Sequence, residues 1–151
     1  MIRQERRRAR AAARKRSGNA SPELSDHLET GRRGETLAYW FLRSRGYVMV
    51  ARNLRLRRDA GELDMAGWDG NVLAFVEVKT RTSREAGLPE EAVGNDQRRR
   101  IARAAQLFVR RLGRKDIMYR FDIVSVFSDL ENGYQLKLFK DAFRTSSVSR
   151  S

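Results

Sequence analysis

Asp64, Glu77 and Lys79 are the residues of this chain whose types and spacing best suit a chemical role. Two short strands, 62–66 and 72–79, joined across an Asp-Gly turn signal, predict a hairpin that brings these side chains together. Glu77 and Lys79 share one face of the second strand because strand side chains alternate. Clustered carboxylates attract a divalent cation, and a nearby lysine stabilises developing negative charge, so this set suits phosphodiester hydrolysis.

The second strand of the hairpin has apolar residues on both faces, which predicts a central position in a sheet. Burying an acid and an amine at the end of such a strand is unfavourable unless they are paired or hold a metal. Glu62 lies on the same face as Asp64 and is an auxiliary candidate. A salt bridge from Lys79 to Asp64 or Glu77, with no chemistry, accounts for the same residues and stays open.

A long helix is expected before the hairpin, from about residue 21 to 45, with Ser21 as its N-cap. Its apolar stripe includes Glu35. Gly31 and Gly34 within the helix predict close backbone packing or a break, since each costs roughly 1 kcal/mol relative to alanine. Glu35 either approaches a metal or pairs with an arginine such as Arg32.

A second helix is expected over residues 95–112, with Asn95 as its N-cap and Gly113 as its stop. Gln97 lies on the apolar face at the positive end of this helix. There its amide either orients a water or phosphate oxygen or caps nearby backbone. The outer face is basic. Five arginines on this face or after the hairpin are candidates for contact with nucleic acid: Arg81, Arg84, Arg98, Arg99 and Arg103.

The charge balance predicts a polyanionic partner, because 32 Lys and Arg residues outnumber 19 acids and give a net charge of +13. About half of this excess lies in residues 1–16. We therefore expect a basic tail over residues 1–20, one domain over 21–143 and a polar tail over 144–151. The basic tail either contacts phosphates or is only a solvated extension.

The ligand chemistry open to this chain is narrow, because it has no cysteine and only one histidine, His27. Oxygen ligands favour Mg²⁺ or Mn²⁺. No apolar run is long enough to span a bilayer, so we expect a soluble, cytoplasmic protein without membrane contact.

Further strands at 47–53, 119–127 and 134–139 predict an α/β class with a mixed sheet flanked by helices. Asp122, within an apolar strand, is expected to pair with an arginine.

Several segments resemble the YraN-like family of small bacterial proteins, over about residues 31–143: GRRGETLAYWFLRSRGY, GELDM, FVEVKTR and RFDIV. That family is regarded as having the restriction-endonuclease-like PD-(D/E)XK fold and is similar to archaeal Holliday-junction resolvases. The resemblance implies that Glu35, Asp64 and Glu77 are metal ligands and that Lys79 is the catalytic lysine. Gln97 stands where the family usually has lysine.

These observations predict a Mg²⁺- or Mn²⁺-dependent endonuclease that binds nucleic acid, most readily DNA, with branched or damaged DNA as the substrate by analogy. A first alternative is a DNA-binding protein of the same fold without turnover. A second is a basic structural or ribosome-associated protein whose acids form internal salt bridges. A homodimer is compatible with a resolvase-like activity, although no self-pairing motif is visible.

Overall fold

The computed structural model of the chain describes residues 22–57, 60–82, 93–129 and 131–145, with only the backbone described at 22–25 and 27. The basic tail, Ser21, Arg84, the side chain of His27 and most of the polar tail therefore lie outside the described part. The chain divides into two compact units, Met1–Thr30 and Gly31–Ser151. The sheet and the site belong to the second unit.

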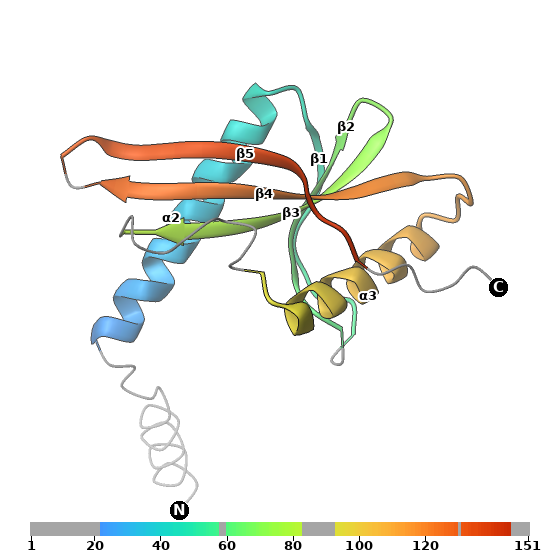
Figure 1. The fold of residues 1–151 in the computed structure, drawn as a ribbon, viewed down its shortest axis with the longest axis horizontal. Coiled ribbons are helices and arrows are strands. Elements are labelled where there is room, and N and C mark those ends of the chain that lie inside the picture. The colour runs from blue at the N-terminus through green and yellow to red at the C-terminus, as the bar shows by residue number, and fades with distance from the viewer. Residues whose placement is uncertain (1–21, 58–59, 83–92, 130, 146–151) are drawn as a thin grey trace, which may run out of the picture. The chain divides into compact units, whose positions relative to one another are not determined.

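The described residues form two helices and five strands in the order that the sequence predicts (Figure 1). They are α2 (Pro22–Ser44), β1 (Val48–Leu54), β2 (Leu63–Asp69), β3 (Val72–Arg81), α3 (Asn95–Arg111), β4 (Met118–Asp129) and β5 (Gly133–Phe143). This confirms the α/β class with a mixed sheet and flanking helices. The strands β2 to β5 extend beyond the predicted ranges by two to five residues each, and β2 begins one residue later than predicted. The apolar pattern weakens before backbone pairing ends.

The five strands form one sheet in the order β1-β2-β3-β4-β5. Three of the four neighbouring pairs are antiparallel, and β3 and β4 are parallel. A parallel pair needs a long crossover connection, which α3 supplies. The central position of β3 confirms the prediction made from its apolar residues on both faces.

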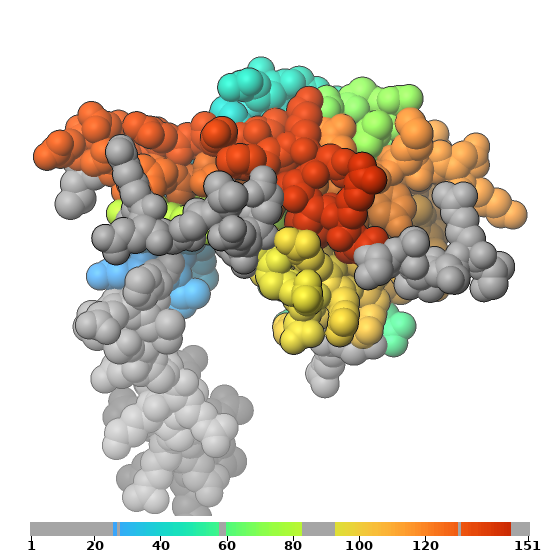
Figure 2. All heavy atoms as spheres, in the orientation of Figure 1, coloured from blue at the N-terminus to red at the C-terminus, as the bar shows by residue number. Residues whose placement is uncertain are grey.

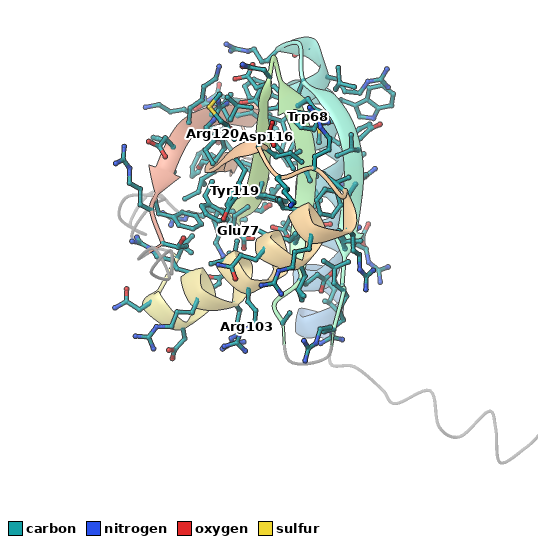
Figure 3. All side chains as sticks on the ribbon, turned by 90° about the vertical axis from the view of Figure 1, so that its right-hand side faces the viewer. Trp68, Glu77, Arg103, Asp116, Tyr119 and Arg120 are labelled. Carbon is teal, nitrogen blue, oxygen red and sulfur yellow. The ribbon has the colours of Figure 1, made fainter. Side chains whose placement is uncertain are left out.

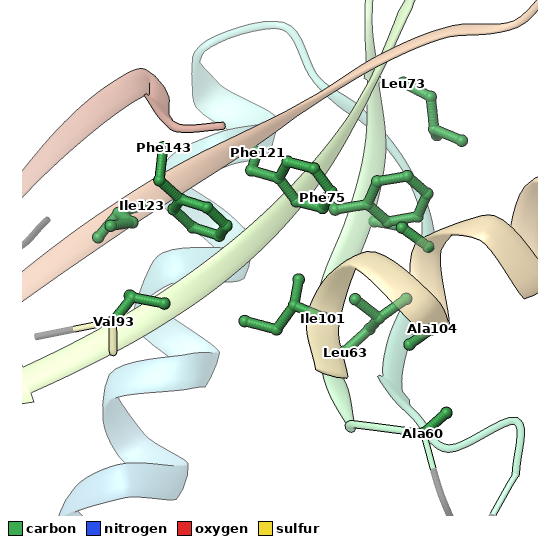
Figure 4. Packing of buried hydrophobic residues seen from close by; sticks show 12 residues of the cluster. Ala60, Leu63, Leu73, Phe75, Val93, Ile101, Ala104, Phe121, Ile123 and Phe143 are labelled. Carbon is green, nitrogen blue, oxygen red and sulfur yellow. The ribbon is translucent and has the colours of Figure 1, made fainter. Parts of the chain in front are cut away.

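The two helices pack against opposite faces of this sheet, so each face has its own apolar core. On one face, Ala38 and Leu42 of α2 pack with Met65, Val76 and Val124. The other face holds α3, whose buried Ile101, Ala104 and Ala105 meet strand residues that include Phe75, Phe121 and Phe143 (Figure 4). Figure 2 shows the atoms of α3 directly against those of the end of β5. The polar residues at the end of β3 thus lie between two packed helices.

The β2–β3 hairpin is tighter than the five-residue connection 67–71 expected from the sequence. Gly67, Trp68 and Asp69 pair with β3, so only Gly70 and Asn71 form the turn. Gly70 has φ +60°, and a positive φ at the first central position is what a type II′ turn needs. Gly67 belongs to the strand because it pairs with Met49 of β1 and Ala74 of β3, and a Cβ there would come within 2.8 Å of Met49 Sδ.

The start of α3 also differs from the prediction. Asn95 is the first helical residue and Gly94 takes the N-cap position, with no side-chain capping hydrogen bond. The Gly94 carbonyl accepts from the Arg98 N–H at 2.9 Å. The expected stop at Gly113 is confirmed, since this residue has φ +67° and its N–H donates to the Arg110 carbonyl at 3.1 Å.

Candidate active site

The end of the β2–β3 ladder brings Asp64 and Glu77 side by side. The last paired residues are Met65 and Val76, so the next position outward sets Asp64 opposite Glu77. Asp64 Oδ2 accepts a hydrogen bond from the Val78 N–H at 2.8 Å, where backbone pairing has stopped. The carboxylate therefore closes the ladder as well as facing Glu77, and the predicted hairpin juxtaposition is present.

Glu77, Lys79 and Gln97 form a closed ring of polar contacts between β3 and α3. Gln97 Nε2 donates to Glu77 Oε1 at 2.8 Å, and Lys79 Nζ lies 3.1 Å from the same oxygen. Lys79 Nζ also donates to Gln97 Oε1 at 3.4 Å. Figure 3 shows Glu77 on the sheet side of α3. The Gln97 amide thus joins the acid and the amine, and both of these contacts are with side chains.

The carboxyl groups of Asp64 and Glu77 are hydrogen-bonded to each other and largely shielded from water. Burial is the main cause that raises the pKa of Glu77 to about 8, and the charge of Asp64 is the second. Burial also raises the pKa of Asp64, although the Val78 N–H opposes this shift. Because its pKa is about 8, Glu77 holds a proton at neutral pH, and a cation in place of that proton would relieve the repulsion between the two carboxylates.

Glu35 approaches the same region from α2. Burial raises its pKa first, and the charges of Asp64 and Glu62 raise it further. Arg52 and Arg32 oppose that shift, but no ion pair joins Glu35 to a described arginine. Glu62 itself is exposed. In the described part of the chain no three acidic or histidine side chains form a ready ligand group, so convergence of Glu35 with the pair stays a prediction.

Two glycine contacts hold the backbone around this cluster. A Cβ at Gly34 would collide with Thr80 Oγ1, so α2 touches β3 directly beside Glu35. Gly31 has nothing within 4 Å of such a Cβ, so the predicted close packing applies to Gly34 alone. On the other side, the Gly61 N–H donates to the Arg100 carbonyl of α3 at 3.3 Å. Both helices are thereby docked at the open end of the hairpin.

The arginines predicted to contact nucleic acid differ in how far they are engaged within the fold. Arg98 is engaged within the fold, because its Nε donates to the Val93 carbonyl at 2.9 Å and its guanidinium lies 5.3 Å from the Phe143 ring. Arg99 is exposed beside Asp96, at 3.8 Å. Arg103 is exposed and points away from the sheet (Figure 3). Arg81 ends β3 and is partly exposed.

A second polar network fixes the opposite part of the sheet. Asp122 is fully buried, and Arg120 Nε donates to it at 2.8 Å. Tyr47 Oη also donates to Asp122 at 2.9 Å, while Arg120 reaches Asp69 at 2.6 Å. Burial and then the Asp122 charge raise the pKa of Tyr47. The predicted arginine partner of Asp122 is confirmed, and this network is structural. Tyr47 and Asp69 carried no sequence signal for it.

Together the fold and the cluster define a small mixed α/β protein with paired carboxyls and a lysine at the open end of a central hairpin. The model of the uncharacterised protein family UPF0102 matches residues 34–126. The chain is 44% identical over 125 residues to a UPF0102 protein of Koribacter versatilis, covering 83% of this chain and 86% of that relative. The chain therefore belongs to the UPF0102 family, the YraN-like family that its motifs indicate.

Two further relatives match this chain over most of their own length. A UPF0102 protein of Caldicellulosiruptor saccharolyticus is 41% identical over 116 residues, covering 76% of this chain and 97% of the relative. A UPF0102 protein of Symbiobacterium thermophilum is 44% identical over 113 residues, covering 75% of this chain and 94% of the relative. Within the described residues, no helix combines the length and the apolar character needed to cross a bilayer.

Proposed function

We propose that this protein is a metal-dependent nuclease of the PD-(D/E)XK superfamily that hydrolyses DNA phosphodiester bonds. The observation that carries the proposal is the grouping of Asp64, Glu77 and Lys79, with Lys79 Nζ only 3.1 Å from Glu77 Oε1. Paired, desolvated carboxyls beside an amine are the parts that phosphoryl transfer to water requires. Branched or damaged DNA is the proposed substrate, by analogy with resolvases.

The donor set of the cluster fits a small, hard cation. Asp64 and Glu77 offer only oxygen ligands, and a divalent cation in place of the Glu77 proton would neutralise both carboxylates. Mg²⁺ is commonly held by one or two protein carboxylates, with water and phosphate completing its coordination. Bound there, Mg²⁺ or Mn²⁺ would polarise the phosphoryl oxygen and lower the pKa of a bound water. Glu35 is the third proposed ligand.

The remaining residues of the cluster hold groups in place and stabilise charge. Lys79 would stabilise the negative charge that develops on the phosphoryl oxygens as water attacks. Gln97 contacts both Glu77 and Lys79, so it would fix the direction of each side chain. Glu62, exposed next to the pair, is an auxiliary acid. Arg81, Arg99 and Arg103 are proposed phosphate contacts that orient the DNA.

The proposal is tested by incubating the purified protein with junction, flap and duplex DNA in Mn²⁺. Cleavage should fall at least 100-fold in Glu77→Ala and in Lys79→Ala, by the size of effects seen when a charge-stabilising group is removed. Lys115→Ala is the matched control, because Lys115 is exposed and lies outside the cluster. Cleavage that survives both cluster substitutions would overturn the assignment.

The Lys79–Glu77 contact favours competing functions in which the acids form internal salt bridges and carry out no chemistry. The first alternative is a DNA-binding protein of the same fold without turnover. Such a protein would bind DNA in the presence or absence of Mn²⁺, and it would cleave none of the three substrates. A structural or ribosome-associated role predicts that neither junction, flap nor duplex DNA binds at physiological salt. Binding without cleavage in every metal tested would replace the nuclease with the first of these alternatives.

A further inference from the structure

The outer face of α2, together with Arg52 of β1, carries a set of aromatic and arginine side chains that the carboxyl cluster does not use. Trp40 is 58% exposed, and its ring meets that of Tyr39 edge-on at 5.4 Å. The Arg43 guanidinium lies 4.9 Å from the Trp40 ring, and that of Arg52 lies 4.7 Å from the Tyr39 ring. We name these four residues, Tyr39, Trp40, Arg43 and Arg52, the aromatic–arginine surface.

Trp40 contributes little to the core that α2 forms with the sheet. The neighbouring Leu37, Tyr39 and Phe41 pack against that core, whereas Trp40 is absent from it. A single exposed apolar residue is ordinary on a protein surface. What distinguishes Trp40 is that two arginines already lie over the faces of its ring and of the adjoining Tyr39 ring, which is the arrangement of a cation–π layer.

The charge around this surface fits a polyanion. The chain has no acidic residue between Glu35 and Asp59, and six arginines lie in that interval. Arg52 also donates to Thr36 Oγ1 at 3.5 Å, which directs its guanidinium along the outer side of α2. A flat indole bordered by guanidinium groups matches a ligand that has both flat rings and phosphates, and the Glu35 carboxylate acts on Arg52 without forming an ion pair with it. Nucleic acid has both.

We propose that the aromatic–arginine surface binds an unpaired nucleotide of a single-stranded DNA segment, with the base stacked on Trp40 and its phosphates held by Arg43 and Arg52. The proposal rests on the proposed function, since that function brings DNA to the protein. A duplex covers the faces of its bases, so an exposed indole selects single-stranded segments. Base–aromatic stacking changes affinity about 5- to 150-fold per base.

The position of Trp40 on α2 agrees with this role. It follows Glu35 by five residues, which places it about 7.5 Å further along the helix axis and about 140° around it. Trp40 is therefore separate from Glu35 but lies on the same helix. A strand leaving the cluster along α2 would reach it, and branched or damaged DNA supplies such an unpaired strand.

The sequence contains two tryptophans. The test therefore uses the full chain with Trp68→Phe, which leaves Trp40 as the only indole. Oligothymidylate and a duplex of equal length are titrated in EDTA, which prevents cleavage, while indole emission and the anisotropy of a labelled strand are followed. We expect oligothymidylate to quench Trp40, and Trp40→Ala to lower its affinity about 5- to 150-fold. Met118→Ala, at a residue that is 56% exposed, should leave the affinity unchanged.

The outcomes separate this inference from the proposed function. Binding of the oligonucleotide by anisotropy, without quenching and with equal affinity in Trp40→Ala, overturns the surface and leaves the nuclease proposal standing. No binding of either DNA overturns both. If Trp40→Ala instead turns a dimer into a monomer in sedimentation, a second copy occupies this face and the inference fails. Trp40→Phe keeps a ring there and should retain most of the affinity, which guards against loss of folding.

Discussion

In the metal-free protein, Glu77 makes the free energy of unfolding depend on pH. Burial first, and the charge of Asp64 second, raise the pKa of Glu77 from 4.5 to about 8 in the folded state. The unfolded chain keeps the ordinary value. Between these two values the folded state holds a proton that the unfolded state has lost. Stability that is fully present at low pH is therefore lost as the pH rises through about 8.

The expected magnitude follows from this one-proton difference. Linkage gives a slope of about 1.4 kcal/mol per pH unit, so a rise from pH 5 to pH 7 lowers the free energy of unfolding by about 2–3 kcal/mol. Glu77→Gln has no proton to lose at this position, so that contribution to the slope disappears. We expect the variant to be the more stable protein at pH 7. Urea unfolding in EDTA, at intervals between pH 5 and pH 8, measures the difference.

The control is Glu131→Gln, at an exposed residue beside the β4–β5 turn, which should keep the wild-type slope. The quantity that matters is the slope of the wild type minus that of each variant. The reasoning is refuted if Glu77→Gln follows the wild type across the whole range, or if the wild type gains stability relative to the variant as the pH rises.

Two further predictions concern the packing that supports the site. Gly34→Ala should destabilise the protein by about 1–3 kcal/mol, because the new methyl group collides with Thr80; Gly31→Ala should be neutral or stabilising by up to about 1 kcal/mol. Equal effects of the two in urea unfolding would contradict the close approach. Asp122→Ala should cost about 3–5 kcal/mol, since it leaves buried partners unpaired, whereas Asp116→Ala at an exposed residue should cost almost nothing. A small loss in Asp122→Ala, by thermal unfolding, would show that the network is dispensable.

The fold was predictable to the level of element order because its patterns are local. The apolar stripe of each helix, the two-face apolar run of β3 and the Asp-Gly turn each depend on neighbouring residues. The end of the first hairpin was not predictable in the same way. Gly67 resembles a loop residue in sequence, yet it lies in β2 because it pairs with Met49 of another strand. Only tertiary structure supplies that neighbour.

The part of the candidate site whose geometry depends only on strand alternation was predictable. Asp64, Glu77 and Lys79 lie on one face of a single hairpin, and the structure brings them together. The partner of Gln97 could not be chosen from the sequence, because it depends on how α3 crosses the sheet. The contact of Gly34 with Thr80 and that of Arg52 with the Tyr39 ring also cross between elements. The spacing of Trp40 and Arg43 within one helix was the available signal for the aromatic–arginine surface.

The engagement of Arg98 corrects a simple view of α3 as a uniformly basic face. Its guanidinium holds the Val93 carbonyl and lies over Phe143, so it fixes the start of the helix against the sheet. Arg99 and Arg103 project further out and are better placed for phosphate. A run of arginines on one helix can therefore combine a packing role with a binding role, and charge alone does not separate the two.

The most direct measurement is calorimetric titration of the metal-free protein with Mn²⁺. If Asp64 and Glu77 hold a cation, the wild type should bind Mn²⁺ at one site, Asp64→Asn and Glu77→Gln should each abolish that binding, and Asp116→Asn should retain it. An absence of binding in the wild type, or binding that both cluster variants keep, would contradict the account.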